Sequence, residues 1–215
     1  MIRLHIFCEG QTEETFVRDL LLDHFSRMNI FVNPILVQTS KSGRGGLSTY
    51  GKIRRQLQIK CQEDSQSFVT TMFDLYGLPE DTPGYGLLYP GLNSEEKANL
   101  IEQAIEKELQ MVNFIPNLMV HEFEALLFTK PEAFASWFDY SVVAELKQER
   151  IGFTSPEDIN NAKETSPSHR ILRICNGYKK VLHGVEIAKE IGFETIRAEC
   201  KHFNAWIARL ERLGK

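Results

Sequence analysis

Acidic side chains follow several apolar stretches in the first 130 residues, at points where each stretch ends abruptly. Glu9 ends the run Ile2–Cys8, Asp74 ends Phe68–Phe73, and Glu122 and Glu124 follow Ile115–Val120. Glu13 comes one helical turn after Glu9. Carboxylates gathered at one place repel each other unless a cation neutralises them, and sets of oxygen ligands select hard ions. The pattern predicts a site for Mg²⁺ or Mn²⁺, with Glu9, Asp74, Glu122 and Glu124 as ligands and Glu13 as ligand or base.

Each acid also has a simpler interpretation. Glu13 lies in the first turn of an expected helix, where the helix dipole favours an anion. Asp74 is placed to cap a turn before Gly77. Glu122 and Glu124 are placed in the first turn of a further helix, and His121 beside them is either a general base or a structural residue. Agreement among three strand ends favours the metal site.

The elements that must position these acids alternate along the chain. Strands are expected over Ile2–Cys8, Ile30–Val37, Phe68–Phe73 and Ile115–Val120, and helices from residue 12, over residues 48–61 and over residues 94–109. This alternation is typical of crossover units and a parallel sheet. Ligands of such sheets bind beyond the carboxyl ends of the strands. The predicted fold class is therefore α/β, with a parallel sheet of about four strands flanked by helices.

After residue 130 the strand signal fades, and five helices are expected. We expect residues 1–130 to form the α/β domain and residues 131–215 a helical extension packed on or beside it. The expected helices cover residues 134–146, 156–163, 169–174, 179–191 and 202–213.

Composition restricts the class of protein. The formal net charge of −4 gives no global basic field for nucleic acid, so such contacts must come from local patches. No apolar run reaches the ~18 residues of a membrane span, and the four cysteines form no CxxC pair, which argues against a zinc cluster. A cytoplasmic protein without a membrane partner is expected.

Two stretches rich in basic residues and free of acids are candidate binding segments for DNA or RNA. The first, residues 41–60, includes a glycine-bearing loop, and the second is residues 166–185. The other interpretation of both is a solvated helix face. The glycines of the loop do not form a P-loop, so the chain is not expected to bind ATP itself. The proposed nucleic-acid contacts are Lys41, Arg44, Lys52, Arg54, Arg55, Arg170, Arg173 and Lys179.

Several motifs resemble a known family. CEGQTEETF resembles the first motif of Toprim domains, and with HEFEALLF it resembles the Toprim branch of OLD-family nucleases. Together with MFDLYGLPED, SPEDINNA, SPSHRI and CKHFNAWIARLE, the chain resembles a family of small stand-alone Toprim-like proteins described only as a domain of unknown function. The resemblance implies that Glu9 is the Toprim glutamate and Asp74 the first aspartate of its DxD motif.

One position departs from that motif. Tyr76 stands where the second aspartate is expected, so two-metal chemistry would need Glu13, Glu122, Glu124 or Asp81 in its place. The number of metals stays open.

The resemblance implies a metal-dependent endonuclease that works with a separate ABC-type or AAA ATPase subunit in bacterial defence against phage, and it leaves open whether the chain forms a homo-oligomer. The alternative is a non-catalytic subunit that binds nucleic acid or supports assembly on a degenerate Toprim scaffold. Nucleotidyl transfer is less favoured, because no template-handling or zinc module is recognisable.

Overall fold

A parallel sheet forms the centre of the computed structural model, which describes residues 1–38, 47, 49–160 and 163–214. The strand order is β2-β1-β3-β4, and β5 also pairs with β3. Every pairing is parallel, so the carboxyl ends of the strands share one edge. The prediction of an α/β fold with a parallel sheet is confirmed. The strands are β1 (Ile2–Cys8), β2 (Ile30–Leu36), β3 (Ser67–Asp74), β4 (Phe114–Ile115) and β5 (Leu118–Met119).

The last predicted strand is interrupted, which corrects the sequence expectation of one strand over residues 115–120. Pro116 cannot donate a ladder hydrogen bond. At the next residue, the Asn117 amide N–H donates to Thr71 Oγ1 over 3.0 Å and the Asn117 side chain donates to the Thr71 carbonyl over 3.1 Å. These bonds with β3 replace the regular ladder, so two short strands take the place of one.

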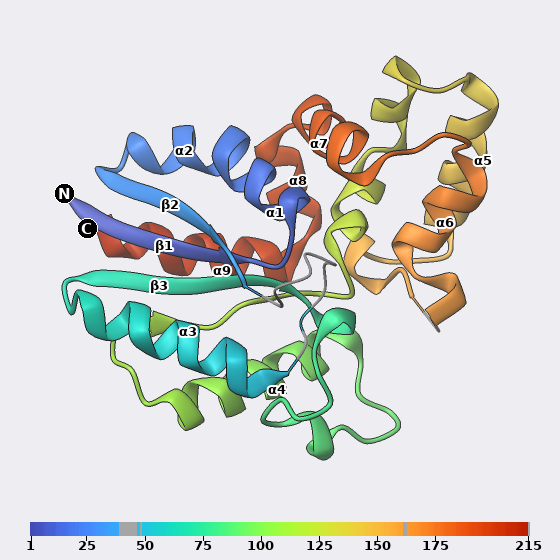
Figure 1. Cartoon of the computed structure of the whole chain (residues 1–215). Helices are drawn as coiled ribbons and strands as arrows, with labels where there is room; N and C mark the ends of the chain where they lie inside the picture. Colours follow the sequence, from blue (N-terminus) through green and yellow to red (C-terminus); the bar gives the residue numbers. More distant parts are fainter. Residues whose placement is uncertain (39–46, 48, 161–162, 215) are drawn as a thin grey trace.

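Helices cover both faces of the sheet (Figure 1). On β1, Leu4, Ile6 and Cys8 point to one face and Phe7 to the other, as the two-residue period of a strand requires. The first face is covered by the N-terminal helix and the C-terminal segments, and the second by α3 and α4. The helices are α1 (Gln11–Phe16), α2 (Leu22–Ser26), α3 (Tyr50–Glu63), α4 (Ser94–Leu109), α5 (Tyr140–Ile151), α6 (Pro167–Ile174), α7 (Val185–Ile191), α8 (Phe193–Glu199) and α9 (Lys201–Glu211).

Helix α1 continues without a break through a π-helical turn, η1 (Val17–Leu21), into α2. Such turns differ from α-helix by one extra residue per hydrogen-bonded ring. A second π-helical segment, η8 (Lys180–Gly184), leads into α7. Two 3-10 helices, η4 (Phe123–Thr129) and η5 (Pro131–Ser136), connect the sheet to α5. The segments that carry candidate site residues are therefore partly non-α.

The C-terminal half packs on the sheet through α9. The Trp206 indole N–H donates to Thr70 Oγ1 of β3 over 2.9 Å, and Phe203 and Ile207 are buried in the same core as Leu4 and Phe16. At the other end, α5 and α6 lie beyond the carboxyl edge of the sheet (Figure 1). The domain boundary at residue 130 stays a prediction.

The helix limits in this half differ from those predicted. A single helix over residues 134–146 is wrong, because the extended backbone of Asp139 separates η5 from α5. The helix expected from residue 156 is only the 3-10 turn Pro156–Asp158. Helix α8 was not predicted, and Gly192, whose φ of 88° favours glycine, separates it from α7. No helix in the described ranges is both long and apolar enough to cross a bilayer.

Candidate metal and phosphodiester site

Acidic residues from separate segments meet around one ammonium group at the carboxyl edge of the sheet. Lys180 Nζ lies 3.0 Å from Glu124 Oε2, 3.6 Å from Asp74 Oδ2 and 3.8 Å from Glu13 Oε1. Glu13 comes from α1, Asp74 ends β3 and Glu124 lies in η4, so residues far apart in sequence form this group. We call Glu9, Glu13, Asp74 and Glu124, together with Lys180, the carboxylate cluster.

Glu9 lies behind Asp74, where the chain leaves β1. Its Oε2 accepts a hydrogen bond from the Asp74 backbone N–H over 3.2 Å. The space beside it depends on Gly77, because a Cβ there would lie 2.7 Å from both carboxylate oxygens of Glu9. A glycine at this position is therefore required for Glu9 to keep its place against β3.

Backbone N–H groups orient two further acids of the cluster. Asp74 Oδ1 accepts from the Phe123 N–H over 3.0 Å, which ties the end of β3 to η4, so the interpretation of Asp74 as the cap of a local turn is wrong. Glu13 Oε2 accepts from the Gly10 N–H over 2.9 Å. Glu13 thus serves the start of α1 with one oxygen and faces Lys180 with the other.

Glu122 points elsewhere. Its Oε1 accepts from the Ser168 N–H over 2.8 Å, at the start of α6, and within the described residues it forms no ion pair with Lys180. Asp81, considered as a replacement ligand, accepts from the Tyr50 N–H over 3.0 Å and so caps α3. Of the acids weighed to fill the place of the missing aspartate, the structure brings Glu13 and Glu124 to Asp74.

Burial raises the affinity of three carboxyl groups of the cluster for protons. The pKa of Glu124 is raised to about 7 by desolvation, which Lys180 opposes. Desolvation also raises the pKa of Glu9 to about 7, against the hydrogen bond from Asp74, and raises that of Asp74 well above its ordinary value. Lys180 has a raised pKa despite its burial, because Asp74, Glu124 and Glu13 favour its charged form. Neighbouring groups with such perturbed pKa values are typical of functional sites.

The donor set fits a hard divalent cation. Glu13 Oε1 and Glu124 Oε1 are buried and make no hydrogen bond of normal geometry within the described residues, and unsatisfied buried oxygens of this kind call for an explanation. The ammonium distances exceed the ~2.0–2.6 Å of metal–oxygen bonds. In the part of the chain that the structure describes, no three His, Cys, Asp or Glu side chains are yet arranged to hold a metal ion. A metal would therefore require these side chains to rotate inward.

Lys180 is the residue that sequence reasoning missed. In the sequence it is one of several basic residues in the acid-free stretch 166–185, adjacent to Lys179, and nothing local separates the two. The π-helical turn η8 places Lys180 over the cluster while Lys179 stays exposed. The acid-free stretch around Lys180 indicates that it binds an anion. The anions that it contacts are carboxylates from earlier in the chain, Glu13, Asp74 and Glu124.

His121 and Tyr76 form a pair at the rim of the cluster. Their rings stack with centroids 5.2 Å apart, and His121 Nδ1 lies 3.1 Å from the Tyr76 hydroxyl. Burial lowers the pKa of His121 to about 4, so the ring is neutral at pH 7. Its φ of 68° is unusual for a residue other than glycine. The position that departs from the DxD motif thus holds a histidine in place and does not face the acids.

The predicted nucleic-acid contacts divide into three groups. Lys41 and Arg44 lie outside the described residues. Arg54 pairs with Glu108 over 2.7 Å, and Arg170 and Arg173 both pair with Glu149, so these three arginines already have carboxylate partners. The remaining residues are exposed and form no ion pair within the described part of the chain: Lys52, Arg55 and Lys179.

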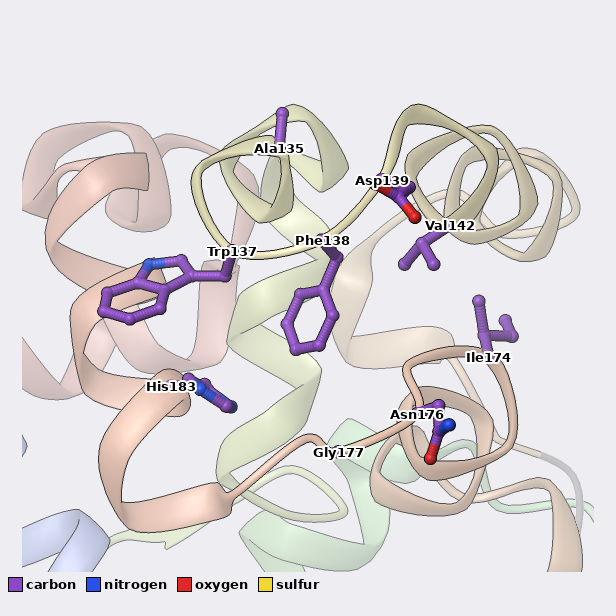
Figure 2. A pocket seen from close by; sticks show the side chains of 9 residues that line it. All are labelled: Ala135, Trp137, Phe138, Asp139, Val142, Ile174, Asn176, Gly177 and His183. Carbon is purple, nitrogen blue, oxygen red and sulfur yellow. The ribbon is translucent and has the colours of Figure 1, made fainter.

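A hollow of about 700 Å³ lies between the segment from η5 to the start of α5 and the segment from the end of α6 to η8 (Figure 2). Trp137, Phe138 and His183 line it, and the His183 ring lies 5.2 Å from Trp137 and 5.3 Å from Phe138, measured between ring centroids. Asp139 is its one acidic lining residue. This hollow shares a helical segment with Lys180 but contains no member of the carboxylate cluster.

Comparisons with known proteins give a family without an assigned activity. Two solved structures of the C-terminal region of the OLD protein from Xanthomonas campestris pv. campestris, phased with iodine and with mercury, are each 15% identical to the chain, with TM-scores of 0.40 and 0.38. The matches cover 99% and 98% of this chain and 98% of each solved chain. No curated protein matches. A family described as a domain of unknown function, DUF4276, matches residues 8–211, and the protein belongs to that family.

Proposed function

We propose that the protein is a metal-dependent phosphodiesterase that cleaves DNA or RNA with Mg²⁺ or Mn²⁺. The observation that carries the proposal is the meeting of Glu13, Asp74 and Glu124 at one cationic group, within 3.8 Å of Lys180 Nζ. This point lies at the carboxyl edge of a parallel sheet, where such folds bind their ligands.

Glu9, Asp74 and Glu124 would hold the metal, with Glu13 as a further ligand or as the base. A divalent ion bound there supplies an activated water and stabilises the charge that develops on the leaving oxygen. The Phe123 N–H holds Asp74 Oδ1, and the Gly10 N–H holds Glu13 Oε2, so the free oxygens of both acids stay directed toward Lys180.

Lys180 would change partners when the substrate binds. Its ammonium now neutralises acids that a divalent ion would neutralise instead. Released from them, it is free to pair with a phosphate oxygen at the same site. Because 38% of its side chain is exposed, the group can reach a ligand from solvent without a rearrangement of the core.

The Toprim resemblance of CEGQTEETF and HEFEALLF extends this proposal to partners. We propose a separate ABC-type or AAA ATPase subunit and a role in defence against phage. A non-catalytic subunit is the second candidate, and one observation favours it: the Lys180 ammonium pairs with three of the acids and offsets part of their charge. In that case the cluster is a structural ion-pair group.

Cleavage and metal binding distinguish the two candidates. Labelled DNA and RNA are incubated with the protein in Mg²⁺, in Mn²⁺ and in EDTA, with and without a candidate ATPase, and Mn²⁺ binding is measured by calorimetry. We expect metal-dependent cleavage that Asp74→Asn and Glu124→Gln abolish and that Glu190→Gln, an exposed acid of α7, leaves intact. Absence of both cleavage and metal binding would refute the phosphodiesterase and favour the structural role.

A further inference from the structure

A separate hollow of about 340 Å³ lies beside the carboxylate cluster. It is small for a ligand pocket, at the low end of the ~300–1,000 Å³ range. Its walls are unusually rich in tyrosine and include a single cation. The lining residues that matter here are Tyr76, Tyr85, Tyr89, Pro90, Lys97 and His121.

This hollow shares its wall with the proposed catalytic site. Tyr76 follows Asp74 by two residues, and His121 immediately precedes Glu122. The Tyr76 backbone N–H donates to the His121 carbonyl over 3.2 Å, so the two segments that leave β3 and β5 are joined at this point. A molecule in the hollow would therefore lie next to the acids and not at a distant surface.

Two of the rings in the hollow are held against each other, and two others are reachable from solvent. Tyr76 and His121 are stacked at an interplanar angle of 24°, and the hydrogen bond between them fixes both rings. Tyr89 is 60% exposed and Tyr85 is partly exposed. Aromatic faces that are held in place and reachable from solvent bind nucleobases by stacking, with little dependence on the base.

The hollow also contains a buried histidine and a lysine whose charge could pair with the phosphate of a nucleotide. His121 is 2% exposed, and its Nε2 makes no hydrogen bond of normal geometry within the described residues, although the Glu157 carbonyl lies near enough to favour protonation. The buried His121 ring therefore forms a fixed part of the wall of the hollow. Lys97, in the second turn of α4, supplies a positive charge for a phosphate.

We propose that this hollow binds one unstacked nucleobase of a single strand whose phosphate backbone passes the carboxylate cluster. The inference rests on the proposed function and specifies its substrate class as single-stranded or locally unpaired nucleic acid. A base in a duplex is covered on both faces by its neighbours, so it can enter only after it leaves the stack.

Binding experiments test the pocket without requiring catalysis. Anisotropy is measured with short labelled strands of DNA and RNA, with a duplex, and with an abasic strand of the same length, all in Ca²⁺ to neutralise the acids. We expect the strands with bases to bind roughly 5- to 150-fold more tightly than the abasic strand, the range that stacking on one aromatic side chain gives. The duplex should bind more weakly than the single strands.

Variants test whether the tyrosines cause the tighter binding of strands that carry bases. Tyr85→Leu and Tyr89→Leu should reduce the advantage of base-containing strands by fivefold or more, and the Phe variants, which keep the ring, should retain it. Tyr140→Leu, at an exposed tyrosine of α5 outside the pocket, is the matched control. Equal binding of abasic and base-containing strands by the unchanged protein, or an unaltered preference in both Leu variants, would overturn the proposal.

A substrate without a nucleobase separates this inference from the proposed function. Hydrolysis of bis(p-nitrophenyl) phosphate requires the carboxylate cluster but not the tyrosines. If the protein hydrolyses this substrate but binds abasic and base-containing strands equally, the phosphodiesterase proposal stands and the nucleobase pocket is refuted. A preference for bases without hydrolysis of any substrate would support the pocket and refute the phosphodiesterase.

Discussion

Replacement of Lys180 by methionine tests whether the ammonium holds the carboxylate cluster together. Methionine keeps an unbranched side chain of similar length and removes the charge. In the unchanged protein, Nζ lies 3.0 Å from Glu124 and 3.6 Å from Asp74. The variant leaves these buried carboxylates without their cation, which is the costly way to break a buried ion pair.

The expected loss of stability can be bounded. At an effective dielectric constant of about 20, each contact of 3.0–3.8 Å corresponds to roughly 4.4–5.5 kcal/mol of attraction before the cost of desolvation. Removal of one partner of a buried pair typically costs ~3–5 kcal/mol. Since 38% of the Lys180 side chain is exposed, water screens part of this, and we expect a loss of about 2–3 kcal/mol in the free energy of unfolding at pH 8.

The loss should depend on pH. The folded-state pKa of Glu124, about 7, lies above its ordinary value of 4.5, so the folded protein holds more protons than the unfolded chain in that interval. Stability of the unchanged protein therefore falls as pH rises from 4.5 to 7, by ~3 kcal/mol for this group. Lys180 lowers the pKa of Glu124, so its removal moves the upper end of the window above pH 7. At pH 5 the Glu124 carboxyl is protonated in both proteins, so its pairing with Lys180 contributes little and the loss should be smaller than at pH 8.

Urea unfolding in EDTA at pH 5 and pH 8, followed by the fluorescence of the buried Trp206, measures both values. Lys179→Met is the control, because this neighbouring lysine is exposed and forms no ion pair among the described residues. Mg²⁺ should restore part of the stability of Lys180→Met at pH 8, since it neutralises the same acids. An equal loss at both pH values would refute the reasoning, because it would assign the effect to packing of the side-chain stem.

Three further changes test the site. Asp74→Asn keeps an acceptor for a backbone N–H and removes a charge, so metal-dependent cleavage should fall by more than ~100-fold, while thermal unfolding occurs at the same or a higher temperature; full cleavage would remove Asp74 from the mechanism. Gly77→Ala should displace Glu9 and weaken Mn²⁺ binding about tenfold in calorimetry, whereas Gly86→Ala, with open space around it, should not; equal affinities would contradict a role for Glu9. Arg55→Ala should reduce the slope of log K against log salt for nucleic-acid binding by roughly 0.7–0.9, and an unchanged slope would assign the residue to a solvated face.

The fold class and the segments that carry the acids could be predicted from the sequence. Alternating apolar runs and helical periodicity are local, so strands such as Ile2–Cys8 and Ser67–Asp74 were predicted to within a residue or two. Parallel order follows from the helices between them, and it brings Glu9 and Asp74 to one edge. The resemblance of the motifs to a domain of unknown function is confirmed by the family match over residues 8–211.

Which acids meet, and that Lys180 lies between them, follows from tertiary packing and could not be predicted from the sequence. Glu122 and Glu124 are two residues apart and equally acidic, yet one caps α6 through Ser168 and the other faces Lys180. Lys180 follows Asp74 by more than a hundred residues, and its place depends on the π-helical turn and on the packing of α7 against the sheet layers. Periodicity reports which face of a segment is apolar, but the meeting of distant side chains depends on how whole elements pack, and a single sequence carries no local signal for that.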